Sequence, residues 1–566
     1  MAADRRHRAG DLVLMGRTAL ALAVEDPMHL VVQGARRFLP RARGSWGPRR
    51  GLGGALAAFV QDRPADARRI LSGVRPRARP ARALRDLLAV ELGVPLGPGA
   101  GRRARARAAW QRGAMTEAVE LLGGTRRSRL RTRMESELGL MRPRSRLALG
   151  RATPARPAGG GVLAVLTNAQ PHTNSGYTFR SQHVFDAIAA SGRRVDAATR
   201  IGYPATIGRP GSAIDWRIGG VNYHRLPAFG LPAALDQRLA AQARQLVALI
   251  AEHDPAILHT TTDWTNAVAT AAAADATGLP WVYEMRGLLE LTWLASRPAA
   301  YREDAEHSER VRLLRAREAD LASAADAVVA LSMTQRADLV SRGVPADAIT
   351  VIPNAVDEAV LARPPVEPAD ARAALGLPRA GLWVGSITSV VGYEGLDVLI
   401  DAIAAARAAG LDVRGAIVGD GVSRPELVAR VDRLGLGEHV LLPGRVPHAE
   451  ALRWYEALDV FAVPRRDTPV CRMVTPVKPL EAMALRRPVI GSDLPALAEI
   501  IGGAGTLARP GDPADLARAL GELADPDERD RYGYAGRQLA LRRTWQAAAQ
   551  TYGDLYRTIL GKDARS

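Results

Sequence analysis

The chain has 566 residues, 47% of them apolar, so it can form several buried cores and is not an intrinsically disordered protein. Its formal net charge is +18, and arginine supplies nearly all of the positive charge, because only Lys478 and Lys562 are lysines. The single cysteine, Cys471, excludes an intrachain disulfide framework and a cysteine metal cluster. It also fits a reducing compartment, so we expect a cytoplasmic protein. The length of the chain predicts about three or four domains.

The positive charge is concentrated near the start of the chain. The first 160 residues hold 33 arginines and 12 acidic residues, whereas the remaining residues hold 44 basic and 47 acidic groups. Clustered cations attract anionic lipid and nucleic acid alike, although a solvated arginine-rich face is an equally simple interpretation. We expect residues 1–150 to meet an anionic membrane on the inner face of the plasma membrane, and we regard nucleic acid as an unlikely partner.

Residues 1–150 are predicted to form an all-α basic module. Segments 61–95 and 111–143 are weakly alike, and their apolar residues are spaced by three and four, which favours helical hairpins or a short helical repeat array. The apolar stretch 12–24 is broken by Arg17, and no apolar run approaches the roughly 20 residues of a membrane span. A glycine- and proline-rich linker follows at residues 151–161.

Two series of buried strands and amphipathic helices then predict two Rossmann-like α/β domains, at residues 162–362 and 363–540. Strands of the first are expected at 161–167, 195–198, 256–259 and 280–284, with a helix over 265–277. Strands of the second are expected at 382–385, 416–419, 440–442, 460–463 and 488–491. A last helix, within residues 541–566, should pack across the domains. Ligands of such sheets bind outside the carboxyl ends of the strands, which predicts a site in the cleft between the domains.

Several motifs of these two segments resemble the GT-B glycosyltransferases of family 4. They lie at residues 352–357, 418–421, 443–446 and 479–484. The segments 175–180, 393–397 and 474–484 are most similar to the exopolysaccharide-type bacterial branch. The resemblance covers about residues 160–560 and leaves residues 1–155 outside it.

This resemblance implies a retaining hexosyltransferase-type enzyme in polysaccharide, cell-envelope glycan or glycolipid synthesis. It would move a sugar from a nucleoside diphosphate sugar to a hydroxyl acceptor or lipid-linked glycan, with no cofactor and no metal. The alternative is a GT-B-like nucleotide-sugar binding protein, or an epimerase or phosphorylase, without transferase activity.

Lys478 and Glu481 are predicted to contact the nucleoside diphosphate of the donor. A departing diphosphate needs fixed positive potential, which Lys478 and the amides of a helix opening near Pro479 can supply. Glu481, one turn into that helix, resembles the glutamate that accepts hydrogen bonds from ribose hydroxyls. We predict Lys478 and Arg472 as catalytic residues, because arginine also grips phosphate. Gly176, Gly385, Ser386, Asp420, Arg445 and Val446 complete the predicted donor site.

Three residues depart from the family pattern. Met473 replaces a glutamate that usually contacts the donor sugar, and Ser386 and Glu394 stand where cations commonly bind the diphosphate. Glu394 would repel phosphate, so the neutralising charge is expected from Lys478, Arg465, Arg466 and Arg472.

The acceptor side is predicted from two segments that follow strands of the first domain. Tyr177 and Arg180 are expected to contact the acceptor or the donor phosphate, and Arg286 and Glu290 are expected to pair and to line the acceptor side. His172 and His259 are isolated in sequence and are more typical of structural histidines.

Overall fold

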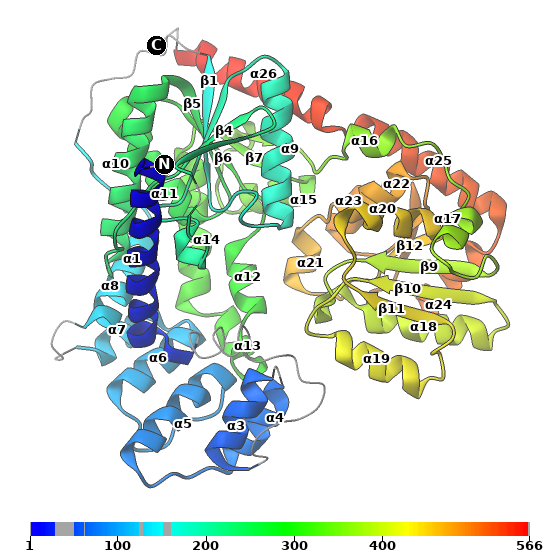
Figure 1. Cartoon of the computed structure of the whole chain (residues 1–566), viewed down its shortest axis with the longest axis horizontal. Coiled ribbons are helices and arrows are strands. Elements are labelled where there is room, and N and C mark those ends of the chain that lie inside the picture. Colours follow the sequence, from blue (N-terminus) through cyan, green and yellow to red (C-terminus); the bar gives the residue numbers. More distant parts are fainter. Residues whose placement is uncertain are drawn as a thin grey trace.

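The computed structural model describes residues 2–28, 50–61, 63–123, 128–150, 160–211 and 213–563. Figure 1 shows a helical module at the N-terminus, two α/β domains side by side, and a last helix that returns from the second α/β domain to the first. Most of the predicted linker at 151–161 lies outside the described residues. None of the described helices is both long enough and apolar enough to cross a membrane.

The first α/β domain contains an eight-stranded sheet in the described residues, with strand order β3-β4-β2-β1-β5-β6-β7-β8. All neighbours are parallel except β3 and β4. The strands are β1 (Gly161–Leu166), β2 (Val195–Thr199), β3 (Asp215–Ile218), β4 (Val221–His224), β5 (Pro255–Thr261), β6 (Trp281–Glu284), β7 (Ala327–Ala330) and β8 (Ile349–Val351).

Helices cover both faces of this sheet, and the alternation of side chains along β1 shows how. Leu163 and Val165 share a core with α10 (Leu235–His253), α11 (Trp264–Thr277) and α14 (Glu309–Ala324). Val162, Ala164 and Leu166 share the opposite core with α9 (Gly176–Ala190) and α26 (Trp545–Asp563). The remaining helices of this domain are α12 (Leu289–Ala295), α13 (Ala299–Glu306) and α15 (Met333–Ser341).

The second α/β domain has a six-stranded parallel sheet with order β11-β10-β9-β12-β13-β14. Its strands are β9 (Leu382–Ile387), β10 (Val413–Val418), β11 (Val440–Gly444), β12 (Val460–Val463), β13 (Val489–Ser492) and β14 (Gly505–Ala508). One face is covered by α18 (Leu396–Ala408), α19 (Arg424–Arg433) and α24 (Pro513–Glu522). The other is covered by α20 (His448–Ala457), α22 (Lys478–Ala484), α23 (Pro495–Ile501) and α25 (Pro526–Arg542). Short helices α16 (Glu358–Leu361), α17 (Pro368–Ala374) and α21 (Pro469–Met473) complete it.

The N-terminal module consists of helices with two small cores of their own. One core joins α3 (Gly51–Val60), α4 (Pro64–Ser72) and α5 (Arg79–Leu92), and the other joins α6 (Arg102–Arg112), α7 (Met115–Leu121) and α8 (Arg129–Met141). Helices α4 and α5, and α7 and α8, fall within the two segments that are weakly alike in sequence. The module is fixed to the first α/β domain, because the backbone N–H and hydroxyl of Thr116 donate to Glu309 on α14, at 2.7 and 2.6 Å.

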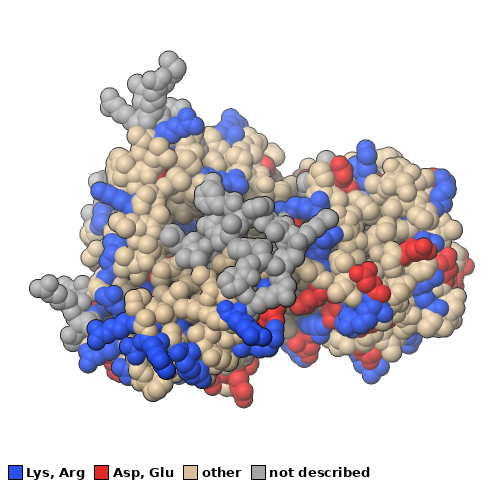
Figure 2. Space-filling view, turned by 60° about the horizontal axis from the view of Figure 1, so that its bottom comes forward, with Lys and Arg blue, Asp and Glu red and all other residues tan. Residues whose placement is uncertain are grey.

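The module carries a basic surface, which we call the arginine face. It consists of the exposed side chains of Arg75, Arg77, Arg79, Arg82, Arg102, Arg103 and Arg105. In Figure 2 lysine and arginine side chains gather on the face of the module, whereas basic and acidic side chains alternate over the second α/β domain. No ion pair joins these seven arginines to a described carboxylate, so their charge is left to solvent or to an anionic partner.

A buried charge cluster connects the first sheet with the last helix. Glu284, at the end of β6, accepts from Arg180 Nε at 2.8 Å and from Arg286 Nε at 2.9 Å, and it lies 3.1 Å from His259 Nε2. The other ring nitrogen of His259 is 2.6 Å from the hydroxyl of Tyr556 on α26. Although burial opposes ionisation, the Arg286 and Arg180 guanidinium groups hold the pKa of Glu284 well below its ordinary value.

The substitution Glu284→Gln should destabilise the first α/β domain strongly, because it leaves two buried guanidinium groups without their carboxylate. A cost of about 3–5 kcal/mol is expected, measured as a lower urea midpoint, with exposed Glu303→Gln as the matched control. The folded pKa is depressed, so this stability is present above the unfolded pKa near 4.5 and is lost at lower pH as Glu284 becomes protonated. Equal urea midpoints for Glu284→Gln and Glu303→Gln would contradict the account.

Candidate functional site

The predicted donor residues come together at the carboxyl edge of the second sheet. Thr388 follows β9, Asp420 follows β10 and Arg445 follows β11, and these three strands are neighbours. Lys478 begins α22 and reaches this edge, because its Nζ donates to Thr388 Oγ1 at 2.6 Å. Burial lowers the pKa of Lys478, and the nearby carboxylates of Glu394 and Glu481 oppose that effect.

The three arginines predicted to neutralise the diphosphate are bonded to carboxylates. Arg465 makes two hydrogen bonds to Glu394, at 3.0 and 3.2 Å, and Arg466 pairs with Asp397. The expected repulsion between Glu394 and a phosphate therefore needs correction, because Arg465 already balances that carboxylate.

The predicted catalytic residue Arg472 is exposed and holds Asp467 with two bonds, at 2.5 and 2.6 Å. Of the four candidate cations, Lys478 alone is held by a neutral hydroxyl, and no ion pair within the described residues includes it. Among these four cations, its charge is the one that no described carboxylate pairs with.

Glu481 lies one turn into α22 and is partly exposed. Its Oε2 accepts from the hydroxyl of Tyr455 on α20 at 2.8 Å. Burial, followed by the neighbouring Glu481 carboxylate, raises the pKa of Tyr455 well above its ordinary value, so this phenol remains a hydrogen-bond donor. Tyr455 was not predicted from the sequence, because only the fold brings α20 beside α22.

Close packing requires glycine at two positions of the carboxyl edge of the second sheet, which we call the donor edge. A side chain at Gly385 would place Cβ 2.3 Å from Ala416 O on the neighbouring strand, and at Gly419 it would place Cβ 1.8 Å from Thr388 O. Gly419 also has φ +143°, which side chains rarely adopt. Ser386 is buried within β9, so its hydroxyl is not at the surface of this edge. Arg445 is exposed, and Val446 packs against the core of the second domain.

The loop after β1 leads into α9, where Ser175 and Thr178 form a reciprocal capping box. Gly176 is exposed, and nothing lies within 4 Å of the place where its Cβ would be, so the described fold does not itself require glycine there. Tyr177 is 46% exposed. Gly176 and Tyr177 are thus open to solvent beside the carboxyl end of β1.

Arg180, Arg286 and Glu290 do not line a surface. All three side chains are buried, and Arg180 and Arg286 are bonded to Glu284. The predicted pair between Arg286 and Glu290 is wrong, because Glu290 instead pairs with Arg342. These residues hold the domain together in this structure, and the direct ligand contacts predicted for them are not available in it.

The two α/β domains meet where two of the sequence motifs touch. Asn354 Nδ2 donates to Thr475 O at 3.0 Å, and Arg180 Nη1 donates to Asn354 Oδ1 at 3.0 Å. A second contact joins the domains nearby. The backbone N–H of Met333, the first residue of α15, donates to Glu499 of α23 at 2.6 Å. The segment 352–357 is therefore bonded to the segment that carries Lys478.

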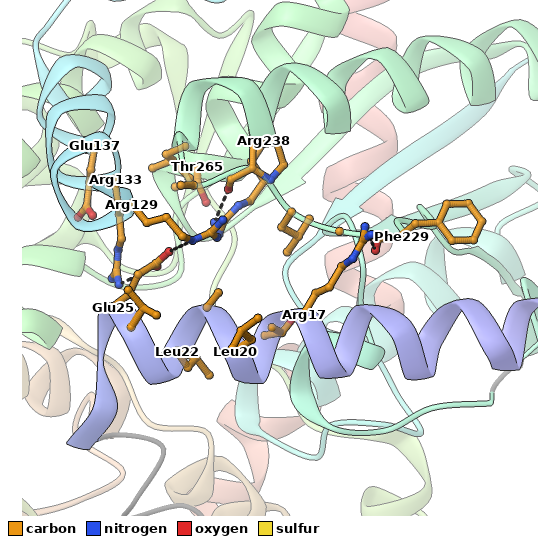
Figure 3. Close-up of a pocket in the computed structure, with 18 of the residues that line it drawn as sticks. Arg17, Leu20, Leu22, Glu25, Arg129, Arg133, Glu137, Phe229, Arg238 and Thr265 are labelled. Atoms are coloured by element: carbon orange, nitrogen blue, oxygen red, sulfur yellow. Dashed lines mark hydrogen bonds and ion pairs between the residues drawn. The ribbon is translucent and has the colours of Figure 1, made fainter. Parts of the chain in front are cut away.

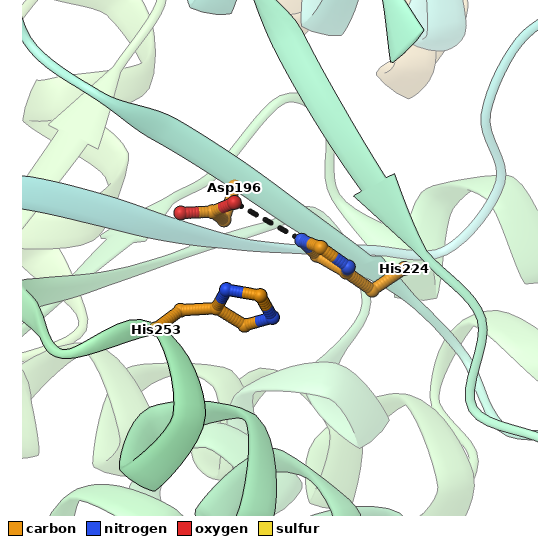
Figure 4. Close-up of side chains that lie close together, drawn as sticks. All are labelled: Asp196, His224 and His253. Carbon is orange, nitrogen blue, oxygen red and sulfur yellow. Dashed lines mark hydrogen bonds and ion pairs between the residues drawn. The ribbon is translucent and has the colours of Figure 1, made fainter. Parts of the chain in front are cut away.

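One group of potential metal ligands was not predicted from the sequence. Asp196, His224 and His253 come from β2, β4 and α10, and their ligand atoms lie within 4.8 Å of one another (Figure 4). His224 lies between two carboxylates, 3.0 Å from Asp196 Oδ1 and 3.0 Å from Asp215 Oδ1. Burial opposes a charged ring, but these hydrogen bonds raise the pKa of His224. The two aspartates hold the ring of His224, and the prediction of no metal stays a prediction.

The two isolated histidines lie in different surroundings. His259 is fully buried in the Glu284 cluster, and burial lowers its pKa. His172 lies edge-on to the rings of Tyr203 and Trp216.

A large cavity lies away from the donor edge. Its volume is about 1200 Å³, and it is bounded by α1 (Ala2–Glu25), α8, the loop at residues 229–233 and the starts of α10 and α11 (Figure 3). Sequence analysis did not predict it, because no local motif marks a surface formed by segments this far apart.

Comparison with known proteins gives a consistent assignment. A family model described as "Glycosyl transferase 4-like domain" matches residues 175–355, and one described as "Glycosyl transferases group 1" matches residues 378–525. A lipopolysaccharide core biosynthesis mannosyltransferase, LpsB, of Rhizobium meliloti (strain 1021) is 34% identical over 25% of this chain and 40% of its own length. The mannosyltransferase LpcC of Rhizobium leguminosarum bv. viciae is 32% identical over 38% of this chain and 61% of its own. The chain thus spans only 40% and 61% of these two relatives.

Solved structures agree on the fold. A sucrose-phosphate synthase from Thermosynechococcus elongatus superposes with a TM-score of 0.56 at 22% identity, covering 71% of this chain and all of the other. Anabaena Alr3699/HepE, solved in complex with UDP, gives 0.54 at 19% identity, covering 70% and 100%. At these identities the likeness shows the GT-B fold alone. The two family models, however, match the two α/β domains in order and together cover more than half of the chain. The chain therefore belongs to the family 4 glycosyltransferases of the GT-B fold.

Proposed function

We propose that the protein transfers a sugar from a nucleoside diphosphate sugar to a hydroxyl acceptor during glycan synthesis. The observation that carries the proposal is the position of Lys478, a cation at the donor edge that is held by Thr388 and by no carboxylate among the described residues. Family membership and the names of the relatives, two of them lipopolysaccharide core mannosyltransferases, support it.

In this proposal Lys478 stabilises the negative charge that builds up on the departing diphosphate. A preorganised charge near developing charge lowers the barrier more than a mobile one, and Lys478 is fixed by its short bond to Thr388. Glu481, oriented by the Tyr455 hydroxyl, would accept hydrogen bonds from the ribose. Gly176 and Tyr177 would approach the donor or acceptor from the first domain.

The stereochemical outcome and the metal requirement are parts of the same proposal. We infer a retaining front-face transfer: the acceptor oxygen forms the new bond to the anomeric carbon, the bond to the diphosphate breaks, and the departing phosphate oxygen takes the acceptor proton. The cation Lys478 would take the place of a metal in charge neutralisation. No side chain of the protein then has to form a covalent intermediate.

The substitution Lys478→Ala should lower kcat by about 100- to 1000-fold, because it removes the fixed charge beside the leaving group. Lys478→Arg should restore part of the rate, since the charge returns in a different shape. Release of nucleotide from a panel of UDP-, GDP- and ADP-sugars gives the measurement. Arg509→Ala, at a side chain 73% exposed, is the matched control. Unchanged turnover in Lys478→Ala would rule out the assigned role.

The alternative is a nucleotide-sugar binding protein, epimerase or phosphorylase with the same cleft. It is favoured by Met473, which lies in α21 close to the donor segment and replaces a carboxylate usual in the family. The two functions differ in the fate of the sugar. A transferase joins it to an added acceptor, whereas the alternatives return free nucleotide sugar, its epimer or a sugar phosphate.

We also propose that the arginine face binds the surface of an anionic membrane, where a lipid-linked acceptor would be found. Seven exposed arginines without a described carboxylate partner support this. Each basic residue near an anionic surface contributes about 1 kcal/mol, so several together give substantial binding. The cytoplasmic side of the membrane, expected from the single cysteine, stays a prediction.

Charge reversal of Arg102, Arg103 and Arg105 should abolish most sedimentation of the protein with phosphatidylglycerol vesicles. Reversal of Arg509, Arg531 and Arg557, three exposed arginines of the C-terminal half that already pair with carboxylates, changes the net charge equally and is the control. Binding to a DNA duplex is measured in parallel. If charge reversal of Arg102, Arg103 and Arg105 abolished DNA binding and left vesicle binding intact, the partner would be nucleic acid and the membrane proposal would be contradicted.

A further inference from the structure

The cavity beside α1 has walls from two origins. Helices α1 and α8 lie outside both family models, whereas the loop at residues 229–233 and the starts of α10 and α11 belong to the first α/β domain. Its volume of about 1200 Å³ exceeds the roughly 300–1000 Å³ of ordinary small-molecule sites. The additional helices of this chain thus create a large space that the α/β domain alone would not have.

One side of this cavity is apolar and open to solvent. Leu20 and Val24 of α1 line it and are 69% and 51% exposed, and Phe229, which lies beside Gly10 of the same helix, is 70% exposed. Val13 lies seven residues before Leu20, so it shares a helix face with Leu20 and Val24 and continues the apolar strip. Contiguous exposed apolar surface of this kind marks a site for an apolar partner.

The end of the cavity near Glu25 is cationic. Figure 3 shows Arg129, Arg133 and Arg238 gathered there, with Arg17 farther along α1. Glu25 is the one carboxylate that Arg129 and Arg133 share, at 3.0 and 3.7 Å. Two more carboxylates belong to the lining, Glu137, which is paired with Arg310 at 2.6 Å, and Asp263, so the four arginines of the lining exceed its three carboxylates.

Arg238 is held in the lining by a neutral oxygen. Its Nη2 donates to the carbonyl of Pro232 at 3.0 Å, and its buried Nε has no hydrogen-bond partner among the described residues. No ion pair within the described part of the chain includes Arg238. Arg17 likewise donates to a carbonyl, that of Phe229, at 3.0 Å. Two guanidinium groups of the lining, Arg17 and Arg238, are thus held by neutral carbonyl oxygens.

We propose that this cavity binds one molecule of a phosphate-bearing lipid, with the phosphate between Arg238 and Arg133 and the hydrocarbon chain along Leu20 and Val24 of α1. Phosphate matches the excess of guanidinium groups at the Glu25 end, and the apolar strip matches a long chain. Either a bilayer phospholipid or a lipid-linked acceptor has this chemistry. The site is separate from Lys478, so it can fail without affecting the proposed transfer reaction.

Binding of dodecyl phosphate to the full chain, measured by calorimetry, tests the site. Wild-type protein should bind it, and neither inorganic phosphate nor dodecyl maltoside should bind at the same concentrations. The double variant Arg133→Gln with Arg238→Gln should weaken binding at least about 10-fold, the loss expected from removing charge-assisted hydrogen bonds. Leu20→Ser with Val24→Ser, at exposed positions that the fold tolerates, should weaken it as well. Arg509→Gln with Arg531→Gln, at exposed side chains of the second α/β domain, is the matched control and should leave the affinity unchanged.

Two vesicle compositions then separate the sources of the lipid. Phosphatidylcholine vesicles are doped with phosphatidylglycerol in one arm and with a polyprenyl phosphate in the other. Weaker binding of the Leu20→Ser, Val24→Ser variant in the first arm identifies a bilayer phospholipid, and weaker binding in the second identifies a lipid-linked acceptor. Dodecyl phosphate binding that is absent, or equal in wild type and both cavity variants, overturns the proposal. Nucleotide-sugar turnover of the same variants is measured without a lipid. Because the cavity is separate from Lys478, this turnover should be unchanged, so a failure of the cavity proposal is distinct from a failure of the transferase assignment.

Discussion

The pair between Arg180 and Glu284 is the constraint on which the arrangement of the two α/β domains depends. Arg180 comes from α9, and its guanidinium also donates to the carbonyls of Ile352 and Pro353 and to Asn354. Asn354 in turn donates to Thr475, three residues before Lys478. Hydrogen bonds thus connect Glu284, at the end of β6, through Arg180 and Asn354 to the segment that carries Lys478. Removing the Glu284 carboxylate would leave the buried Arg180 guanidinium without its ion-pair partner, which lowers the stability of the fold.

This connection explains why a polar cluster occupies a position that an apolar core could fill. Apolar packing would stabilise the domain as well, but it has no direction, whereas a guanidinium with fixed donors sets the position of each acceptor. The last helix joins the same cluster, because Arg180 Nη2 also donates to the Tyr552 hydroxyl and Tyr556 bonds His259. The start of the first domain and the end of the chain are therefore held by one set of charges.

Much of the fold was predictable from local pattern, because the strands of both sheets are short apolar runs between turns. Strands β3, β4, β7, β8 and β14 were not predicted. Of these, β3 lies at the sheet edge, and its residues alternate between exposed and partly buried positions. The sequence also predicted that Lys478 and Glu481 lie on one helix, α22, because one motif holds both; their roles stay predictions. The partners of Arg180, Arg286 and Glu290 were not predictable, because a sequence shows that charges are near one another along the chain and does not show which of them are buried together. The Arg465 pair that balances Glu394 spans 71 residues and was missed for the same reason.

The proposed contact between Lys478 and the diphosphate of the donor can be measured by the binding of nucleotides. The affinities of a nucleoside diphosphate and of the matching monophosphate are measured for wild-type protein and for Lys478→Ala. The account predicts that wild type prefers the diphosphate and that Lys478→Ala binds the two almost equally, because the removed charge contacts the second phosphate. The same preference for diphosphate in both proteins would contradict the account.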